Sequence, residues 1–133
     1  MSTVIIDTDI ALDYLRGREY AKDLLKSWWN NNIAYISILT AYELYAGIKE
    51  DEKEATENFI AACRIEPITL EIAERAGELF RRYRKRGLSP TAADCLINAT
   101  AIINEHKIAT RSISHYPDRD VLLNLPFSYS AGL

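Results

Sequence analysis

The sequence has few of the residues on which several classes of protein depend. Its 133 residues include two cysteines, four prolines and five glycines, and no stretch is of low complexity. These shortages exclude a collagen-like fibre and an intrinsically disordered chain, and they argue against a disulfide scaffold. Cys63 and Cys95 each lie in an apolar helical pattern, so we expect buried free thiols and a reducing compartment.

Long apolar runs and a strong net charge are also missing. No run approaches the ~20 apolar residues that cross a bilayer, and no basic, leucine-rich leader precedes the first predicted strand. We therefore expect a cytoplasmic protein without a membrane segment. The net charge of -3 and the pI near 5.4 argue against a protein that coats nucleic acid by charge alone. A local basic cluster or bound metal ions would still permit a nucleic-acid substrate.

Short β-branched or aliphatic runs alternate with helical patterns along the chain. The predicted strands are 3–6, 33–37, 65–68, 107–110 and about 123–127, and the predicted helices are 10–16, 20–31, 40–48, 54–63, 70–86 and 90–105. Parallel strands need a crossover of a dozen or more residues, which the helices between them supply. The sequence therefore predicts an α/β fold, with residues 1–133 as one domain. Its mostly parallel sheet has about five strands and helices on both faces.

Three acidic residues from distant parts of the sequence are predicted to share one edge of this sheet. Asp7 directly follows the first strand, Glu43 lies on the helix after the second, and Asp94 lies in the first turns of a later helix. In an open parallel sheet, ligands bind beyond the carboxyl ends of the strands. Each acid alone is as well explained as a helix cap or a solvated residue. Glu43 and Asp94 lie in apolar helices, and the polar Asn98 shares the Asp94 face, which favours a common site.

Such a cluster of carboxylates needs protons or a cation to be stable. Two carboxylates about 5 Å apart repel by ~3 kcal/mol at an effective dielectric of 20. Oxygen ligands select Mg²⁺ or Mn²⁺, and neither His106 nor His115 has a second histidine or cysteine at zinc-ligand spacing. These ions commonly serve phosphodiester chemistry, so the residues predict a hydrolytic nuclease. The nearby Asp9 and Asp13 are interpreted as capping and solvated side chains.

Four stretches of the sequence match a known family in its order and at about its spacing. They are IIDTDIALDYLRG, YISILTAYELYAGI, DCLINATAI and KIATRSISHY, and together they cover nearly the whole chain. At these residues the sequence resembles the PIN-domain ribonucleases, and among them the VapC-type toxins of bacterial and archaeal toxin–antitoxin pairs. The resemblance implies that Asp7, Glu43 and Asp94 are the acidic site residues, with Asp7 and Asp94 as the most direct metal ligands. It also implies a metal-dependent endoribonuclease that acts on RNA, and a dimer inhibited by a small antitoxin.

The sequence departs from this family at a fourth position. Similar proteins often carry Asp or Asn just after the threonine–arginine pair, where this chain has Ser112, and Asp118 is the nearest acid. Two alternatives stay open: Ser112 holds a metal-bound water, or Asp118 reaches back to the site. Because of this departure, a PIN-fold module that binds nucleic acid with weakened or lost catalysis is an alternative function. A DNA nuclease is another.

Basic and aromatic side chains are the other candidate binding residues. The run RRYRKRG is either a solvated helix end or a track for RNA phosphates that uses Arg82 and Lys85. Arg111 follows the fourth predicted strand, so we expect it at the active edge, within reach of phosphate. Trp28 and Trp29 cannot both face inward on one helix, which leaves one for a partner surface such as an antitoxin segment.

Overall fold

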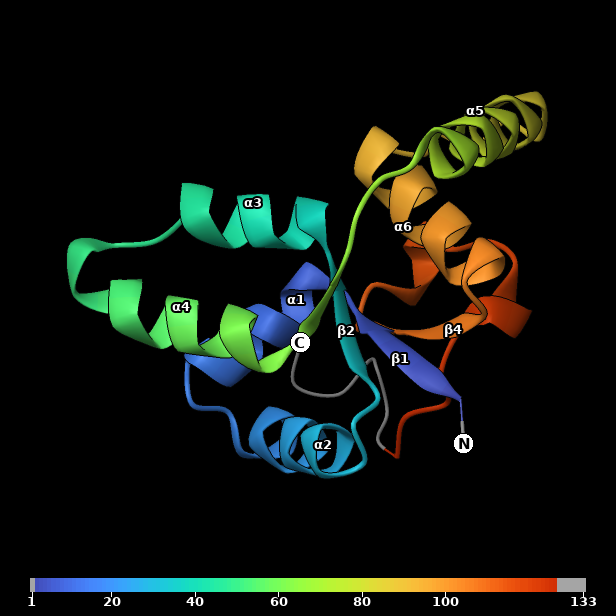
Figure 1. Ribbon diagram of the computed structural model, residues 1–133. Helices are drawn as coiled ribbons and strands as arrows, with labels where there is room; N and C mark the ends of the chain where they lie inside the picture. The colour runs from blue at the N-terminus through green and yellow to red at the C-terminus, as the bar shows by residue number, and fades with distance from the viewer. Residues whose placement is uncertain (1, 127–133) are drawn as a thin grey trace.

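Residues 2–126, which the computed structural model describes, form a four-stranded sheet between two groups of helices (Figure 1). The strands are β1 (Thr3–Ile6), β2 (Ala34–Ser37), β3 (Arg64–Glu66) and β4 (His106–Ala109). The helices are α1 (Thr8–Leu15), α2 (Glu19–Asn30), α3 (Ile38–Ala46), α4 (Lys53–Ala62), α5 (Leu70–Lys85) and α6 (Ala92–Ile103). Every predicted helix is present, with ends that shift by up to about two residues.

The sheet is parallel throughout and has the strand order β3-β2-β1-β4. Val4 of β1 pairs with Ala34 of β2 on one side and with Lys107 of β4 on the other. The prediction of a mostly parallel sheet is therefore confirmed. Because β1 lies in the interior of the sheet, the residue that follows it stands at the middle of the carboxyl edge.

The prediction of about five strands is wrong by one within the described residues. Leu122 makes a single parallel bridge to Ile108, and the Leu123 N–H donates to the Ile108 carbonyl at 2.8 Å. No strand pairing continues from Leu123 to Pro126, and Pro126 has no N–H to donate to a neighbouring strand. The last residue of the predicted strand, Phe127, lies outside the described residues.

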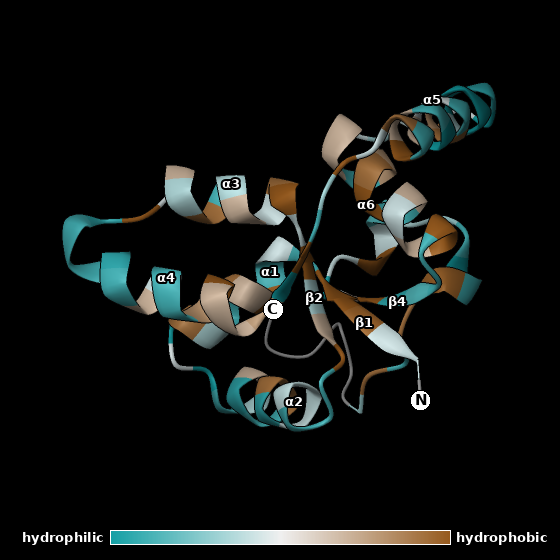
Figure 2. Ribbon diagram, in the orientation of Figure 1, coloured by the Kyte–Doolittle hydropathy of each residue, from teal (hydrophilic) through white to brown (hydrophobic). Residues whose placement is uncertain are grey.

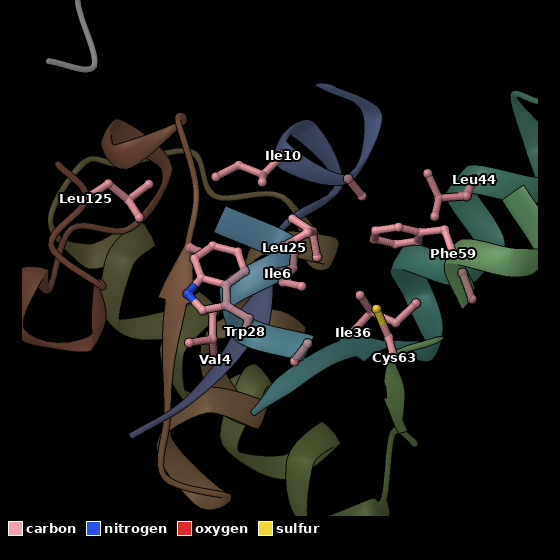
Figure 3. Packing of buried hydrophobic residues seen from close by; sticks show 14 residues of the cluster. Val4, Ile6, Ile10, Leu25, Trp28, Ile36, Leu44, Phe59, Cys63 and Leu125 are labelled. Carbon is pink, nitrogen blue, oxygen red and sulfur yellow. The ribbon is translucent and has the colours of Figure 1, made fainter. Parts of the chain in front are cut away.

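Two different sets of helices cover the two faces of the sheet, as predicted. Alternate strand residues point to opposite faces, so Val4 and Ile6 face α1 to α4, whereas Ile5 and Ile108 face α6. The larger buried cluster includes Val4, Ile6, Ile10, Leu25, Trp28, Ile36, Leu44 and Phe59 (Figure 3). α5 packs against α6, and its ribbon shows more hydrophilic residues than that of α6 (Figure 2).

Local signals in the sequence explain where several helices begin and end. The Ser37 hydroxyl accepts the Leu39 N–H at 3.1 Å to cap α3, and the Thr91 hydroxyl caps α6 in the same way. Gly87, with a φ of +78°, takes the left-handed conformation that ends α5. Cys63 and Cys95 are buried free thiols, as predicted. No helix in residues 2–126 combines the length and the apolar content that a membrane crossing requires.

Candidate active site

Asp7 stands directly after β1 and is only 8% exposed. Its backbone N–H donates to the Ala109 carbonyl at 2.9 Å, which fixes it between β1 and β4. One carboxylate oxygen, Oδ1, accepts the Thr8 N–H at 2.9 Å, so Asp7 itself caps α1. The other oxygen, Oδ2, accepts the Thr110 hydroxyl at 2.8 Å and the Tyr116 hydroxyl at 3.1 Å. The strand thus ends at a buried carboxylate that the fold holds in one orientation.

The environment of Asp7 favours its protonated or cation-bound form. The pKa of the Asp7 carboxyl is raised from 3.8 to about 6, mainly by burial and then by the Asp9 charge, and the hydrogen bonds to Asp7 oppose the rise only in part. Burial is thus a larger cause than the repulsion between carboxylates that the sequence predicts. Burial and the Asp7 charge also raise the pKa of Tyr116, which keeps its hydroxyl protonated as a donor.

Glu43 is brought to Asp7 through Thr8. Glu43 lies exposed on α3, the helix that follows β2, and its Oε1 accepts the Thr8 hydroxyl at 2.6 Å. The same threonine donates its N–H to Asp7, and its hydroxyl lies 3.2 Å from that of the buried Thr40. One residue of α1 therefore holds two of the three predicted acids in place.

Asp94 lies in the first turn of α6, the helix that covers the other face of the sheet. Its carboxylate is 3.4 Å from His115 Nδ1, and its charge contributes to the raised pKa of Tyr116, the donor to Asp7. The charges of Asp7 and Asp94 thus both act on the Tyr116 hydroxyl. Within residues 2–126, no three carboxylate, imidazole or thiol groups already converge as a ligand cage. That the three acids act as one site stays a prediction.

The candidates for the fourth position lie in two different places. The Ser112 hydroxyl is 3.0 Å from Asp9 Oδ2, at the carboxyl edge of β4. Asp118 instead accepts the Tyr83 hydroxyl at 2.7 Å, and the buried Asn98 donates from Nδ2 to that hydroxyl at 3.1 Å. Asp118 and Asn98 therefore share a hydrogen-bond chain with α5, whereas Ser112 lies beside the candidate site.

The interpretation of Asp13 as a solvated residue is wrong. Asp13 is 1% exposed and accepts hydrogen bonds from Arg111 Nε at 2.7 Å and from the Tyr20 hydroxyl, and Arg18 Nε lies 3.4 Å away. A buried carboxylate requires such partners. The Arg111 guanidinium is thus held by Asp13, and the Arg111 backbone N–H donates to Asp9 Oδ2 at 3.0 Å. Arg111 lies at the predicted edge, and its contact with phosphate stays a prediction.

The basic run at the end of α5 is exposed. Arg82 and Arg86 flank Asp118, with shortest N–O distances of 4.0 and 3.5 Å, and both side chains are about half exposed. Lys85 is also exposed on this last turn. Cations here complement the helix dipole, so the RNA track stays a prediction beside that local role.

The two tryptophans of α2 divide as predicted between the core and a more exposed position. Trp28 is 6% exposed and belongs to the buried cluster of Figure 3. Trp29 is half-buried, and its ring packs against Tyr14 and Phe59 with centroid separations of 5.2 and 5.8 Å. Trp29 also lines two adjoining surface grooves beside α1, together with Lys22. A partner could reach Trp29 at these grooves.

A sequence profile of the PIN domain matches residues 4–111, most of the chain. The chain belongs to the PIN-domain family. This PIN domain is 40% identical to ribonuclease VapC19 of Mycobacterium tuberculosis over 114 residues. The alignment covers 85% of this chain and 91% of the relative. It is 33% identical to ribonuclease VapC10 of the same organism over 114 residues, or 86% of each chain.

Solved structures share the fold of this PIN domain. A toxin–antitoxin complex from Klebsiella pneumoniae matches it with a TM-score of 0.77 and 25% identity, over 92% of this chain and 97% of the other. FitAcB from Neisseria gonorrhoeae matches with a TM-score of 0.76 and 24% identity, over 97% and 99% of the two chains. At that identity the second likeness shows the fold alone.

The donors at the carboxyl edge of this PIN domain suit a hard divalent cation. The carboxylate oxygens of Asp7, Asp9 and Glu43 lie there, and Asp94 is the further acid predicted for the site. Mg²⁺ usually keeps several waters and binds one or two protein carboxylates together with substrate phosphate, so three preassembled ligands are not required. Asp9 Oδ1 is buried and has no hydrogen-bond partner among the described residues, and a cation would satisfy it. The residues therefore fit such an ion.

Two residues that hold Asp7 in this PIN domain have no role in the sequence analysis. Thr110 and Tyr116 are completely buried, and both donate to the same carboxylate oxygen. The position of Thr110 at the end of a predicted strand is a signal that could have placed it at the edge. Tyr116 carries no such signal, because it follows a 3₁₀ turn (Ile113–His115) whose path the residue pattern does not determine.

Proposed function

We propose that this PIN domain is a metal-dependent endoribonuclease that hydrolyses RNA phosphodiester bonds at the carboxyl edge of its sheet. The observation that carries the proposal is the buried Asp7 carboxylate, because its raised pKa and its acidic neighbours make a bound cation favourable. The sequence identity of this PIN domain to the ribonucleases VapC19 and VapC10 supports RNA hydrolysis as the reaction class. The proposed catalytic residues are Asp7, Glu43 and Asp94.

Each proposed residue has a role that follows from its contacts. When bound, Mg²⁺ or Mn²⁺ neutralises phosphate charge and lowers the pKa of a water molecule. Asp7 and Asp94 are the proposed direct ligands. The Thr8 N–H and the Thr110 hydroxyl orient Asp7 before substrate arrives. Glu43 is exposed and held by the Thr8 hydroxyl, so it is placed to orient the water or the substrate.

The test is cleavage of single-stranded RNA in chelator and in millimolar Mg²⁺ or Mn²⁺, with parent protein and Asp94→Asn. Asparagine keeps the shape and removes one charge of a proposed direct ligand, so we expect cleavage to fall by at least the roughly 10- to 100-fold that loss of a ligand-orienting residue costs. We also expect metal to raise the melting temperature of the variant much less than that of the parent. Asp51→Asn, at an exposed 3₁₀ turn, is the matched control.

Several outcomes of this experiment would contradict the proposal. Cleavage that persists in chelator would show that the reaction does not need the metal. An Asp94→Asn variant as active as the parent would show that Asp94 does not belong to the site. A DNA strand of the same sequence runs in parallel. Cleavage of DNA alone would favour a DNA nuclease, and binding without cleavage of either strand would favour a non-catalytic module.

The basic run on α5 is proposed to bind RNA phosphates without sequence preference. We expect Arg82→Glu combined with Lys85→Glu to reduce the slope of log affinity against log salt by about 2, because each lost phosphate contact lowers it by about 1. The measurement is RNA binding over a salt series. Lys22→Glu with Lys26→Glu makes the same charge change on α2, across the sheet, and serves as control. An unchanged slope would leave the run as a solvated helix end.

We also propose that the protein is the toxin of a toxin–antitoxin pair and forms a homodimer. The likeness to the Klebsiella pneumoniae toxin–antitoxin complex supports a small antitoxin as partner, and the grooves beside Trp29 suit an inserted apolar side chain. Ile38, Tyr42 and Tyr45 are exposed on one face of α3, a surface that suits a second copy. Co-purification with a small protein encoded next to this one tests the first proposal. A monomer in light scattering would contradict the second.

The remaining proposals concern the cell and the extent of the domain. We place the protein in the cytoplasm, where Cys63 and Cys95 would stay reduced. Cell fractionation tests this location. A single PIN-like domain over residues 1–133 should unfold in one cooperative transition, and two separate transitions would contradict it.

A further inference from the structure

Asp9 has an unusual environment for a residue in the first turn of a helix. Its Oδ2 accepts the Arg111 N–H at 3.0 Å and lies 3.0 Å from the Ser112 hydroxyl. Its Oδ1 is buried and has no hydrogen-bond partner in residues 2–126. A buried carboxylate oxygen without a donor is costly, so the fold holds half of this carboxylate firmly and leaves the other half unsatisfied.

Asp9 and Asp7 lie side by side at the carboxyl edge. The Thr110 hydroxyl lies 2.8 Å from Asp7 Oδ2 and 3.4 Å from Asp9 Oδ2, so one small side chain touches both carboxylates. Two adjacent carboxylates with little access to water repel each other. A divalent cation in contact with both would convert that repulsion into attraction and would satisfy Asp9 Oδ1.

Both alternatives for the fourth position already have hydrogen-bond partners, Asp118 away from the site and Ser112 at Asp9. Asp118 accepts the Tyr83 hydroxyl and pairs with Arg86, on the side of α5. The Ser112 side chain contacts Asp9, so its hydroxyl serves to orient that carboxylate. The acid that is missing after Arg111 therefore has a neighbour of the right chemistry, contributed by α1.

We propose that Asp9 supplies the fourth carboxylate of the metal site and binds a Mg²⁺-type cation, while Ser112 positions Asp9 and does not bind the metal. The inference rests on the proposed function. It corrects the interpretation of Asp9 as a helix cap, since Asp7 caps α1. With Asp9 as a ligand, the metal site has as many carboxylates as it would have with an acid at position 112. The serine at position 112 is then no reason to expect weaker metal binding.

The test is Mn²⁺ binding, followed by the electron paramagnetic resonance of free Mn²⁺ and by melting temperature, with RNA cleavage measured in parallel. Asp9→Asn retains an oxygen for the Arg111 N–H and loses the charge. We expect its Mn²⁺ dissociation constant to rise by about tenfold or more, because loss of residues that only orient a metal ligand already costs about 10- to 100-fold. The matched control, Asp118→Asn, should bind Mn²⁺ like the parent, because Asp118 contacts Tyr83 and Arg86 on the side of α5.

A double variant keeps the test decisive if Asp9→Asn unfolds the site for another reason. Asp9→Asn with Ser112→Asp returns an acid to the position after Arg111, and it should recover most of the Mn²⁺ affinity. Asp9→Asn that binds Mn²⁺ like the parent would overturn the assignment, as would loss of binding in Asp118→Asn alone. A parent protein that binds no Mn²⁺ and cuts no RNA would instead contradict the proposed function.

Discussion

Asp7→Asn is expected to abolish RNA cleavage and, in the absence of metal, to raise the free energy of unfolding by about 2 kcal/mol at neutral pH. The Asp7 carboxyl is buried, and its pKa is raised to about 6, against about 4 in an unfolded chain. The ionised form is therefore disfavoured in the folded protein. Asparagine carries no charge and retains an acceptor for the Thr8 N–H, so it removes most of that cost, while the Thr110 and Tyr116 hydroxyls turn to accept from its Nδ2 amide.

The pH dependence of this gain has a definite sign. A carboxyl whose pKa is higher in the folded state contributes stability below its unfolded pKa, and it loses that contribution as pH rises through about 4 to 6. The stability advantage of Asp7→Asn should thus be absent near pH 4 and complete above pH 6. Urea unfolding in chelator across this range measures it. An advantage that does not change with pH would show that ionisation of Asp7 is not its cause.

Metal should reverse the order of stability. Ions that bind the folded protein stabilise the parent by mass action, and the variant lacks a ligand for them. We expect the parent to gain stability in millimolar Mn²⁺ and Asp7→Asn to gain little. A variant that still cleaves RNA would contradict the placement of Asp7 in the site, whatever its stability.

Asp13→Asn is expected to lower the free energy of unfolding by about 3 kcal/mol, or the melting temperature by roughly 10 °C. Asp13 is 1% exposed and accepts from Arg111 and Tyr20. Its loss leaves the Arg111 guanidinium, whose side chain is 23% exposed, without its anionic partner. Cleavage should fall as well, because the Arg111 backbone N–H holds Asp9 at the site.

Two further variants separate the buried pair from a general loss of packing. Arg18→Ala removes a half-exposed partner of Asp13 and should cost less than about 1 kcal/mol. Asp13→Asn combined with Arg111→Gln removes both charges, so the double variant should be more stable than the sum of the single losses predicts. If the losses in free energy of unfolding of the two single variants add up to that of the double variant, the Asp13–Arg111 pair has no interaction energy.

Residue patterns were enough to predict the parallel sheet and the elements on which the three acids lie, because both follow from strand and helix periods, whereas a common site for the three acids stays a prediction. Asp7 and Asp94 lie next to element ends that the pattern marks clearly. The burial of Asp13 could not be predicted, since its partner Arg111 lies 98 residues away in the sequence. Tyr116 likewise reaches Asp7 across 109 residues. Contacts of this kind depend on tertiary packing, which neighbouring residues do not encode.

The long span of these contacts also governs when the site can form during synthesis. An emerging chain carries Asp7 and Glu43 early, but β1 lacks one neighbour until β4 has been made. Thr110 and Tyr116, which hold the Asp7 carboxylate, follow later still. Such non-local pairing makes folding slow compared with local helix formation. The environment of Asp7 is therefore complete only after β4 and Tyr116 have been made, when most of this PIN domain has already been synthesised.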